Sequence, residues 1–254
     1  MAKFYPSDRD GMIRHYSILN YPGLVHGFST RKGGFSKIPY DSLNMGLNCG
    51  DNRETVLRNR ELFFSALAID PKQVAYPAQV HSGHVAVADK PGLYKQTDAL
   101  ICNIPGLFIT IQTADCFPVF LFDPAQGVWA IIHSGWRGTS KGISTASVER
   151  MKEQFNCKTE TIIAVIGAGI QTNQYQVDEQ TAANFDPVYL INDGPGHYLL
   201  DIQSCIYNQL LDAGLLNKNI ERDTSCTFLQ KKTFYSYRRD GRNSGRMMGV
   251  IGLR

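Results

Sequence analysis

Two apolar runs separated by a short segment rich in turn-forming residues constrain the fold of this chain most strongly. The runs cover residues 118–122 and 128–132, and the segment between them reads Asp-Pro-Ala-Gln-Gly. Apolar runs that flank a turn of this composition predict a β-hairpin. If residues 124–127 form the loop, Asp123 faces Val128 and the numbers of paired residues sum to 251. This register places Pro118 opposite His133.

The register brings a thiol close to an imidazole. Side chains alternate between the two faces of a strand, so Cys116, Pro118 and His133 are expected on one face. Cys116 lies one diagonal step from His133, a separation of roughly 7 to 8 Å between backbones that longer side chains can span. A slip of one residue would separate the pair.

Three interpretations of Cys116 and His133 remain open on this basis. They are a buried structural pair, a Cys-His nucleophile and base for acyl or amide transfer, or part of a metal site. A metal site needs a further ligand, and His81 is the obvious donor because it ends a short predicted strand at 79–81 and precedes a glycine turn. His84 is the spare candidate. One thiolate and two imidazoles leave a fourth position open, as in catalytic zinc sites, and they also suit copper.

The rest of the chain alternates between helical and strand patterns. Asp51 and Glu54 resemble a capping box that opens a helix to Ala68, and Asp201 caps a helix that Gly214 ends. Gly167-Ala168-Gly169 lacks the third glycine and the following helix of a dinucleotide-binding fingerprint, which argues against a Rossmann fold. Further helices are expected at 140–155 and 178–185, and further strands at 99–104, 107–112, 161–166 and 248–253. We predict one mixed α/β (α+β) domain over residues 1–254.

Composition excludes several classes of protein. The formal net charge of +3 is too small to indicate a nucleic-acid-binding protein. Basic residues are concentrated near the C-terminus, where they form either a solvated surface or an anion-binding site. No segment predicts a signal peptide or a membrane span, so a cytoplasmic protein without a membrane partner is expected. The six cysteines show no close pairing, which favours free thiols.

Three blocks of sequence together resemble the YfiH family, also called laccase-domain or multicopper polyphenol oxidase-like proteins. The blocks are Gln79-Val80-His81, Thr113-Ala114-Asp115-Cys116 with Pro118, and His133-Ser134-Gly135-Trp136-Arg137-Gly138. Flanking segments agree with the family as well: 26–31 with Gly33-Gly34, 42–44, and 234–242. Ser82 and Ser134 stand where the family usually has glycine and alanine, and the segment 166–170 lacks a proline that the family tends to carry.

The resemblance implies a metal, normally zinc, on His81, Cys116 and His133, which would also be the catalytic residues. It implies phosphorolysis of adenosine, inosine, guanosine and methylthioadenosine, so purine nucleosides and phosphate are the expected partners. The similar proteins share an α/β sandwich with largely antiparallel central strands that resembles bacterial deamidating toxins. Substrate contacts are expected from five residues in the matching segments: Ser29, Arg31, Asn44, Arg137 and Arg238.

The family has also been linked to adenosine deamination, phenol oxidation and peptidoglycan editing. Deamination would need an unusual proton shuttle, for which Asp115 is a candidate, because the usual zinc deaminase signature is missing. A multicopper oxidase gathers many imidazoles, whereas this chain has six histidines in total. Copper in the three-ligand site would support at most a slow one-electron oxidation. A Cys-His amidase is the remaining alternative.

Overall fold

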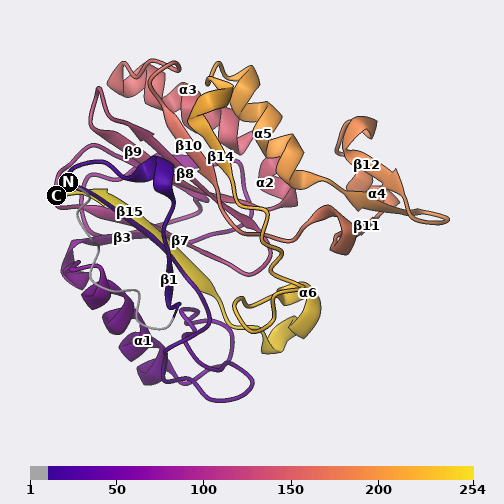
Figure 1. Cartoon of the computed structure of the whole chain (residues 1–254), viewed down its shortest axis with the longest axis horizontal. Coiled ribbons are helices and arrows are strands. Elements are labelled where there is room, and N and C mark those ends of the chain that lie inside the picture. The colour runs from indigo at the N-terminus through magenta and orange to yellow at the C-terminus, as the bar shows by residue number, and fades with distance from the viewer. Residues whose placement is uncertain (1–10) are drawn as a thin grey trace.

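The computed structural model describes residues 11–254, and its strands form three sheets (Figure 1). The first sheet has the order β1-β2-β15-β7-β3-β5, and the second has the order β14-β10-β8-β9-β6-β4. A small third sheet, β11-β13-β12, projects from the body of the molecule. The central pairs of both large sheets are antiparallel, and the parallel pairs lie toward the edges. This architecture confirms the predicted mixed α/β class.

The strands and helices have the following bounds. The first sheet contains β1 (Ile13–Arg14), β2 (Leu24–Ser29), β3 (Val74–Pro77), β5 (Gly92–Tyr94), β7 (Phe108–Thr113) and β15 (Met247–Leu253). The second contains β4 (Val85–Val87), β6 (Ala99–Cys102), β8 (Phe117–Asp123), β9 (Val128–Ser134), β10 (Ile163–Ile166) and β14 (Ile220–Arg222). The third contains β11 (Gln176–Asp178), β12 (Leu190–Asn192) and β13 (His197–Leu200). The helices are α1 (Arg53–Ala66), α2 (Trp136–Ser140), α3 (Ile143–Phe155), α4 (Glu179–Ala182), α5 (Ile202–Asp212) and α6 (Tyr237–Asp240).

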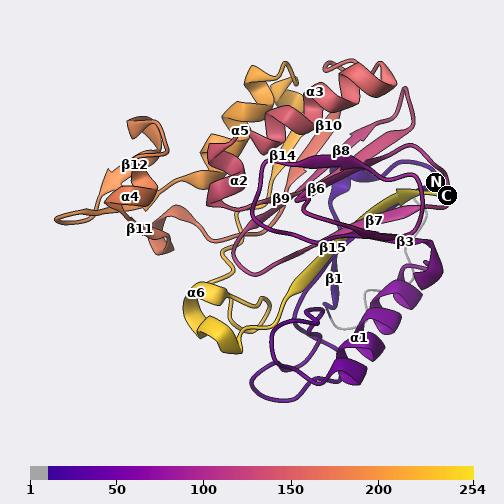
Figure 2. The same cartoon turned by 180° about the vertical axis from the view of Figure 1, so that it is seen from behind.

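The two large sheets pack face to face, with helices on their outer sides (Figure 2). Phe120 and Trp129 of the second sheet meet Ile109 and Ile111 of the first in the interior of this sandwich. Helix α1 covers the outer face of the first sheet, while α3 and α5 cover the outer face of the second. Each large sheet is therefore buried on both faces at its centre, which explains why its central strands are continuously apolar.

The predicted hairpin and its register are confirmed. Strands β8 and β9 pair with Asp123 opposite Val128 and Pro118 opposite His133, as the sum of 251 requires. Every residue of both strands is buried. A shift by one residue would exchange the side chains that face the other sheet with those that face the helices, so packing on both faces fixes the pairing.

The sequence placed several other boundaries incorrectly. The strand expected at 79–81 is wrong, because β3 ends at Pro77 and the chain then turns. The helix expected at 140–155 is in fact two helices, α2 and α3. Gly142 lies between them with a left-handed backbone (φ of 70°), which breaks the helix. The N-cap of α1 is Asn52 rather than Asp51, since the Asn52 side chain accepts the Thr55 N–H. The helix expected at 178–185 shortens to the four residues of α4.

Residues 11–254 include no helix that is both long enough and apolar enough to cross a membrane.

Candidate metal and active site

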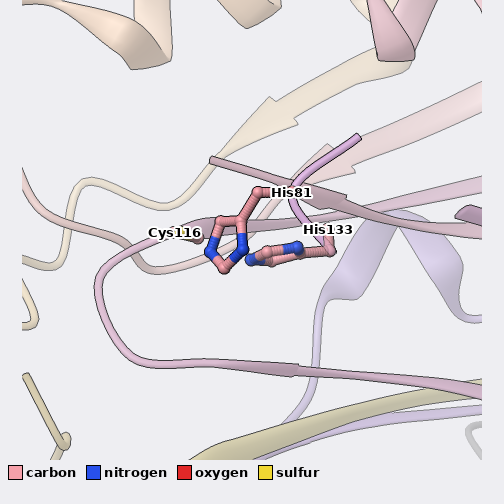
Figure 3. Close-up of side chains that lie close together, drawn as sticks. All are labelled: His81, Cys116 and His133. Atoms are coloured by element: carbon pink, nitrogen blue, oxygen red, sulfur yellow. The ribbon is translucent and has the colours of Figure 1, made fainter. Parts of the chain in front are cut away.

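Three side chains from separate segments converge at the open end of the β8–β9 hairpin. His81 lies in the loop after β3, Cys116 in the bend before β8, and His133 near the end of β9 (Figure 3). Their potential ligand atoms all lie within 4.8 Å of one another. The imidazole rings of His81 and His133 meet edge to face, with centroids 4.8 Å apart. The structure thus brings together the three residues that the sequence singled out.

Cys116 reaches the site by a route that strand alternation did not predict. Strand β8 begins at Phe117, so Cys116 precedes the pleated part of the hairpin. The preceding residue, Asp115, adopts a left-handed backbone with φ of 87°. Its carboxylate accepts hydrogen bonds from the Thr227 hydroxyl at 2.7 Å and from the Arg238 backbone N–H at 2.7 Å. These contacts brace the bend that presents the thiol, and they occupy both oxygens of the residue considered above as a proton shuttle.

Asp98 organises the site, although sequence reasoning did not identify it. Its Oδ1 accepts hydrogen bonds from His133 Nδ1 at 2.8 Å and from the His81 backbone N–H at 3.0 Å. Its Oδ2 accepts the backbone N–H and the hydroxyl of Ser82 at 2.7 and 2.8 Å. One carboxylate at the start of β6 therefore fixes the imidazole of one ligand and the loop that carries another.

The contacts of Asp98 set the tautomer and the strain of its neighbours. Because His133 Nδ1 donates to a carboxylate, its Nε2 is left to face Cys116 and His81. The His81 backbone has φ of 57°, an uncommon conformation for a residue with a Cβ. The three backbone N–H groups of residues 80–82 that point at Asp98 hold the loop in this shape. Burial alone would raise the pKa of Asp98, but the hydrogen bonds from His133 and Ser82 outweigh it and hold the pKa well below its usual value.

Cys116 and His133 favour a thiolate beside an imidazolium when no metal is bound. Burial opposes both charges, yet the pKa of Cys116 falls to about 6 because both imidazoles hydrogen-bond its sulfur and His133 carries charge. Burial likewise opposes charge on His133, but the Cys116 thiolate and Asp98 raise its pKa to about 9. A thiolate is the form of cysteine that binds metals or acts as a nucleophile. This pair therefore supports both of the chemical interpretations raised above.

The backbone at Gly135 must approach the thiol closely. A Cβ built at this position would lie 2.7 Å from Cys116 Sγ, so a larger residue would displace the sulfur. Gly135 is also the N-cap of α2, which turns the chain away immediately after His133. The glycine directly after the hairpin is thus a steric requirement of the site.

Two arginines and a tyrosine lie beside the three ligands. The guanidinium carbon of Arg238 sits 5.3 Å from the centre of the Tyr175 ring, and that of Arg137 sits 4.3 Å from the Trp136 ring. Burial is the main cause of the raised pKa of Tyr175, and the charges of Cys116, Arg238 and Arg137 also act on its hydroxyl. Sequence reasoning missed Tyr175, because a single tyrosine before a short strand carries no pattern that indicates a site.

The other residues predicted to contact substrate lie elsewhere. The Ser29 hydroxyl accepts the Met248 N–H in the interior of the first sheet. Asn44 is also fully buried, and its side chain bonds the backbone of Gly46 and Arg246. Arg31 lines a different hollow, which none of the three ligands lines. Of the five predicted contacts, Arg137 and Arg238 are the two whose charges act on Tyr175 together with that of Cys116.

Comparison with known proteins identifies the family. Residues 25–254 match the family model described as multi-copper polyphenol oxidoreductase laccase. A purine nucleoside phosphorylase of Deinococcus radiodurans is 37% identical over 93% of this chain and 92% of its own length. The chain belongs to the YfiH family. The purine nucleoside phosphorylase YfiH of Escherichia coli is 35% identical over 91% of this chain and 94% of its own length.

The fold agrees with solved YfiH-family structures. The crystal structure of YlmD from Geobacillus stearothermophilus superposes with a TM-score of 0.90 and 29% sequence identity, covering 96% of this chain and 99% of that one. The two large sheets and the helices described above are therefore the architecture of the family. Within residues 11–254, His81, Cys116 and His133 are the only group of histidine, cysteine or acidic residues with the geometry of a metal site.

The chemistry of the donor set fits a metal ion. A thiolate and two imidazoles suit zinc, and both copper and zinc accept such ligands. Asp98 supplies the outer carboxylate that usually orients a metal-bound histidine. His81 is exposed and Cys116 only partly buried, so the group is accessible from solvent.

Proposed function

We propose that this protein is a zinc-dependent purine nucleoside phosphorylase. The observation that carries the proposal is the set of three ligands, His81, Cys116 and His133, which is open on one side and has Arg137, Arg238 and Tyr175 beside it. Adenosine, inosine, guanosine and methylthioadenosine are the proposed substrates, and phosphate is the second one. The relatives named as purine nucleoside phosphorylases cover almost the whole chain, which supports this choice over other zinc chemistry.

In the proposed reaction each group around the three ligands has a separate role. A bound zinc ion supplies Lewis-acid chemistry toward an oxygen ligand. Asp98 keeps His133 in one tautomer, and Asp115 keeps Cys116 in place. Arg137 and Arg238 place positive charge where a phosphate would bind, and the Tyr175 hydroxyl is a neutral donor whose proton burial retains. Attack of phosphate on the anomeric carbon of the ribose then releases the base and forms ribose 1-phosphate.

Product analysis tests the proposal directly. Purified protein incubated with inosine and phosphate is expected to form hypoxanthine and ribose 1-phosphate, and to form neither when phosphate is omitted. Chromatography of the base and an assay for ribose 1-phosphate measure the two products. Free ribose in the absence of phosphate would indicate a nucleosidase, and no product from any of the four nucleosides would refute the proposal.

Arg238 offers a test of the phosphate contact. Arg238→Ala removes the guanidinium, while the backbone N–H that bonds Asp115 stays in place. Because charged hydrogen bonds to phosphate are roughly twice as strong as neutral ones, we expect the KM for phosphate to rise about 10-fold or more, with the zinc content unchanged. Arg242→Ala is the matched control, since this arginine is exposed on the turn after α6. An equal change in both variants would contradict the assignment.

Metal binding is expected to depend on pH in a defined way. Between pH 6 and 9 the metal-free site keeps a proton on His133 while Cys116 is a thiolate. A metal must displace that proton, so the apparent affinity should rise about 10-fold per pH unit in this window. Titration calorimetry in buffers of different ionisation enthalpy measures the number of protons released. We expect about one at pH 7.5, and a value of zero would contradict the thiolate–imidazolium pair.

Two alternatives have specific support. A copper ion at the same ligands would oxidise simple phenols slowly, in line with the description of the family model. A Cys-His amidase would use the thiolate of Cys116 as its nucleophile. Chelators separate the copper oxidase from the amidase. Removal of the metal should abolish phenol oxidation, whereas an amidase should keep its activity after metal removal and lose it on thiol alkylation. Adenosine deamination, also proposed for the family, would appear as inosine in the product analysis.

A further inference from the structure

A hollow lined mainly by basic residues is separate from the group of three ligands, since none of the three lines it. It has a volume of about 660 Å³ and is formed by the segment 31–42 after β2 and the segment 231–240 around α6. None of the three metal-ligand candidates and none of the aromatic residues lines it. We call this hollow the basic pocket. Its two segments are about 200 residues apart in the sequence, so only the fold brings their charges together.

The charges in the basic pocket are not balanced. Five of its lining residues are cationic and two are anionic, an excess of three. This excess equals the formal net charge of the whole chain, so the remainder of the protein is balanced overall. The two carboxylates are already paired, Asp41 with Arg31 at 3.2 Å and Asp240 with Arg239 at 2.8 Å.

Three lysines carry the unpaired charge. Within the part of the chain that the structure describes, Lys32, Lys231 and Lys232 form no ion pair. Like charges held together repel each other, and the repulsion destabilises the folded state unless counter-ions or a ligand compensate it. An anionic ligand in the pocket would satisfy all three.

Hydrogen bonds from two arginine side chains to backbone carbonyl oxygens brace the segments from which these lysines extend. The Arg31 guanidinium donates to the Asp41 and Lys231 carbonyl oxygens at 2.8 and 3.0 Å, and it stacks on Tyr235 at 4.7 Å. The Arg239 guanidinium donates to the Thr227 and Phe228 carbonyl oxygens, both at 2.9 Å. The two arginines line the pocket and brace its walls, and the bond from Arg31 to the Lys231 carbonyl joins its two segments directly.

We propose that the basic pocket binds a small oligophosphate, a ligand with at least two linked phosphate groups, at a site separate from the three metal ligands. One phosphate group carries about −1.5 to −2 charges, so a single group is too little and at least two are needed to match an excess of three. The volume is within the range of pockets that hold small molecules rather than single ions. The lack of aromatic residues in the lining argues against single-stranded nucleic acid, whose bases stack on aromatic rings.

The pocket and the metal-ligand site share helix α6. The backbone N–H of Arg238 bonds Asp115 next to Cys116, whereas Arg239 and Asp240 line the basic pocket. The inference does not require the proposed phosphorylase activity, because it concerns the binding of a different ligand at different residues.

Tripolyphosphate binding tests the inference. Titration calorimetry of the full-length protein at low salt is expected to show one tripolyphosphate per chain, and Lys231→Ala with Lys232→Ala should weaken it at least 10-fold. The control pair is Lys158→Ala with Lys218→Ala, two exposed lysines outside the pocket that should leave the affinity unchanged. Cys116→Ser should also leave it unchanged, although nucleoside cleavage is lost.

Several results would overturn the inference. They are no binding by the wild-type protein, an equal loss in the two lysine pairs, a loss in Cys116→Ser, or complete displacement of tripolyphosphate by a single-stranded oligonucleotide at matched phosphate concentration. Thermal unfolding of each variant shows whether it is folded, and surface lysine-to-alanine changes are not expected to lower the melting temperature. If the wild-type protein bound tripolyphosphate but showed no phosphorolysis, the proposed function would be refuted and the binding inference would stand.

Discussion

Cys116→Ala is expected to abolish both metal retention and phosphorolysis while the protein remains folded. Cys116 supplies the one thiolate among the three ligands, and two imidazoles alone do not provide the three protein ligands typical of catalytic zinc. The side chain lies in a bend before β8 and is only partly buried, so its removal leaves the sheet core intact. We expect less than about one tenth of the wild-type zinc content and a loss of roughly 1,000-fold or more in kcat/KM for inosine.

The measurements are elemental analysis of the purified protein, steady-state kinetics and circular dichroism. Cys205→Ala is the matched control, because Cys205 is a free cysteine of α5 that packs in the core and is not one of the three ligands. It should lower stability and keep both zinc and activity. If Cys116→Ala retained stoichiometric zinc and still cleaved inosine, the metal assignment would be wrong. Activity that survives chelation in the wild-type protein but is lost on alkylation would instead favour the Cys-His amidase.

Asp98→Asn is expected to weaken zinc binding by about 10- to 100-fold, the usual effect of removing an outer-shell partner of a metal ligand. The asparagine keeps the size of the side chain but replaces one acceptor oxygen with an NH₂ group. That group would face donors, namely His133 Nδ1 or the backbone N–H groups of His81 and Ser82. Both the orientation of His133 and the strained loop at His81 would then lose their support.

A purely structural role for Asp98 would give a different result. Competition with a chromophoric chelator measures zinc affinity, and the visible spectrum of the cobalt-substituted protein reports the ligand geometry. Urea unfolding of the metal-free variant measures stability separately. Asp89→Asn is the control, since Asp89 is an exposed aspartate that bonds Tyr94. Lower stability with unchanged zinc affinity and an unchanged cobalt spectrum would contradict the positioning role.

The hairpin and two of the three ligands could be predicted because they depend on local pattern. Apolar runs around a Pro- and Gly-containing turn set the register, and the register places Cys116 and His133 at one end. His81 was the obvious further donor from its place before a glycine turn, and the family resemblance then favoured the three-ligand metal site over the other interpretations. The prediction of a strand at 79–81 failed because the segment is held by hydrogen bonds to Asp98 rather than by strand pairing.

Asp98 and Tyr175 could not have been found in the same way. Asp98 lies at the start of β6, 35 positions before His133, and only the pairing of β6 with β9 brings the two together. Tyr175 precedes the small third sheet and reaches the site only through the path of the chain after β10. An isolated aspartate or tyrosine has many structural uses, so its identity alone does not indicate a site.

The distribution of the arginines also depended on the tertiary structure. Arg31, Arg137 and Arg238 were equivalent as candidate anion ligands in the sequence. The fold brings Arg137 and Arg238 within electrostatic reach of Tyr175, as it does Cys116, and it places Arg31 in the lining of the basic pocket together with Lys231 and Arg239. Long-range packing decides such positions, because charges far apart in the chain carry no information about one another until the sheets and α6 are in place.

The sequence by itself determined the fold class, the hairpin register and the three candidate metal ligands, since these follow from hydrophobic periodicity, turn chemistry and motif blocks that lie within short stretches of chain. Only the tertiary structure decided what supports the ligands and where the anion-binding groups lie. The supporting contacts join residues tens to hundreds of positions apart, as Asp98 joins His133 and Asp115 joins Arg238. Their formation depends on the packing of both sheets, which no local pattern in the sequence specifies.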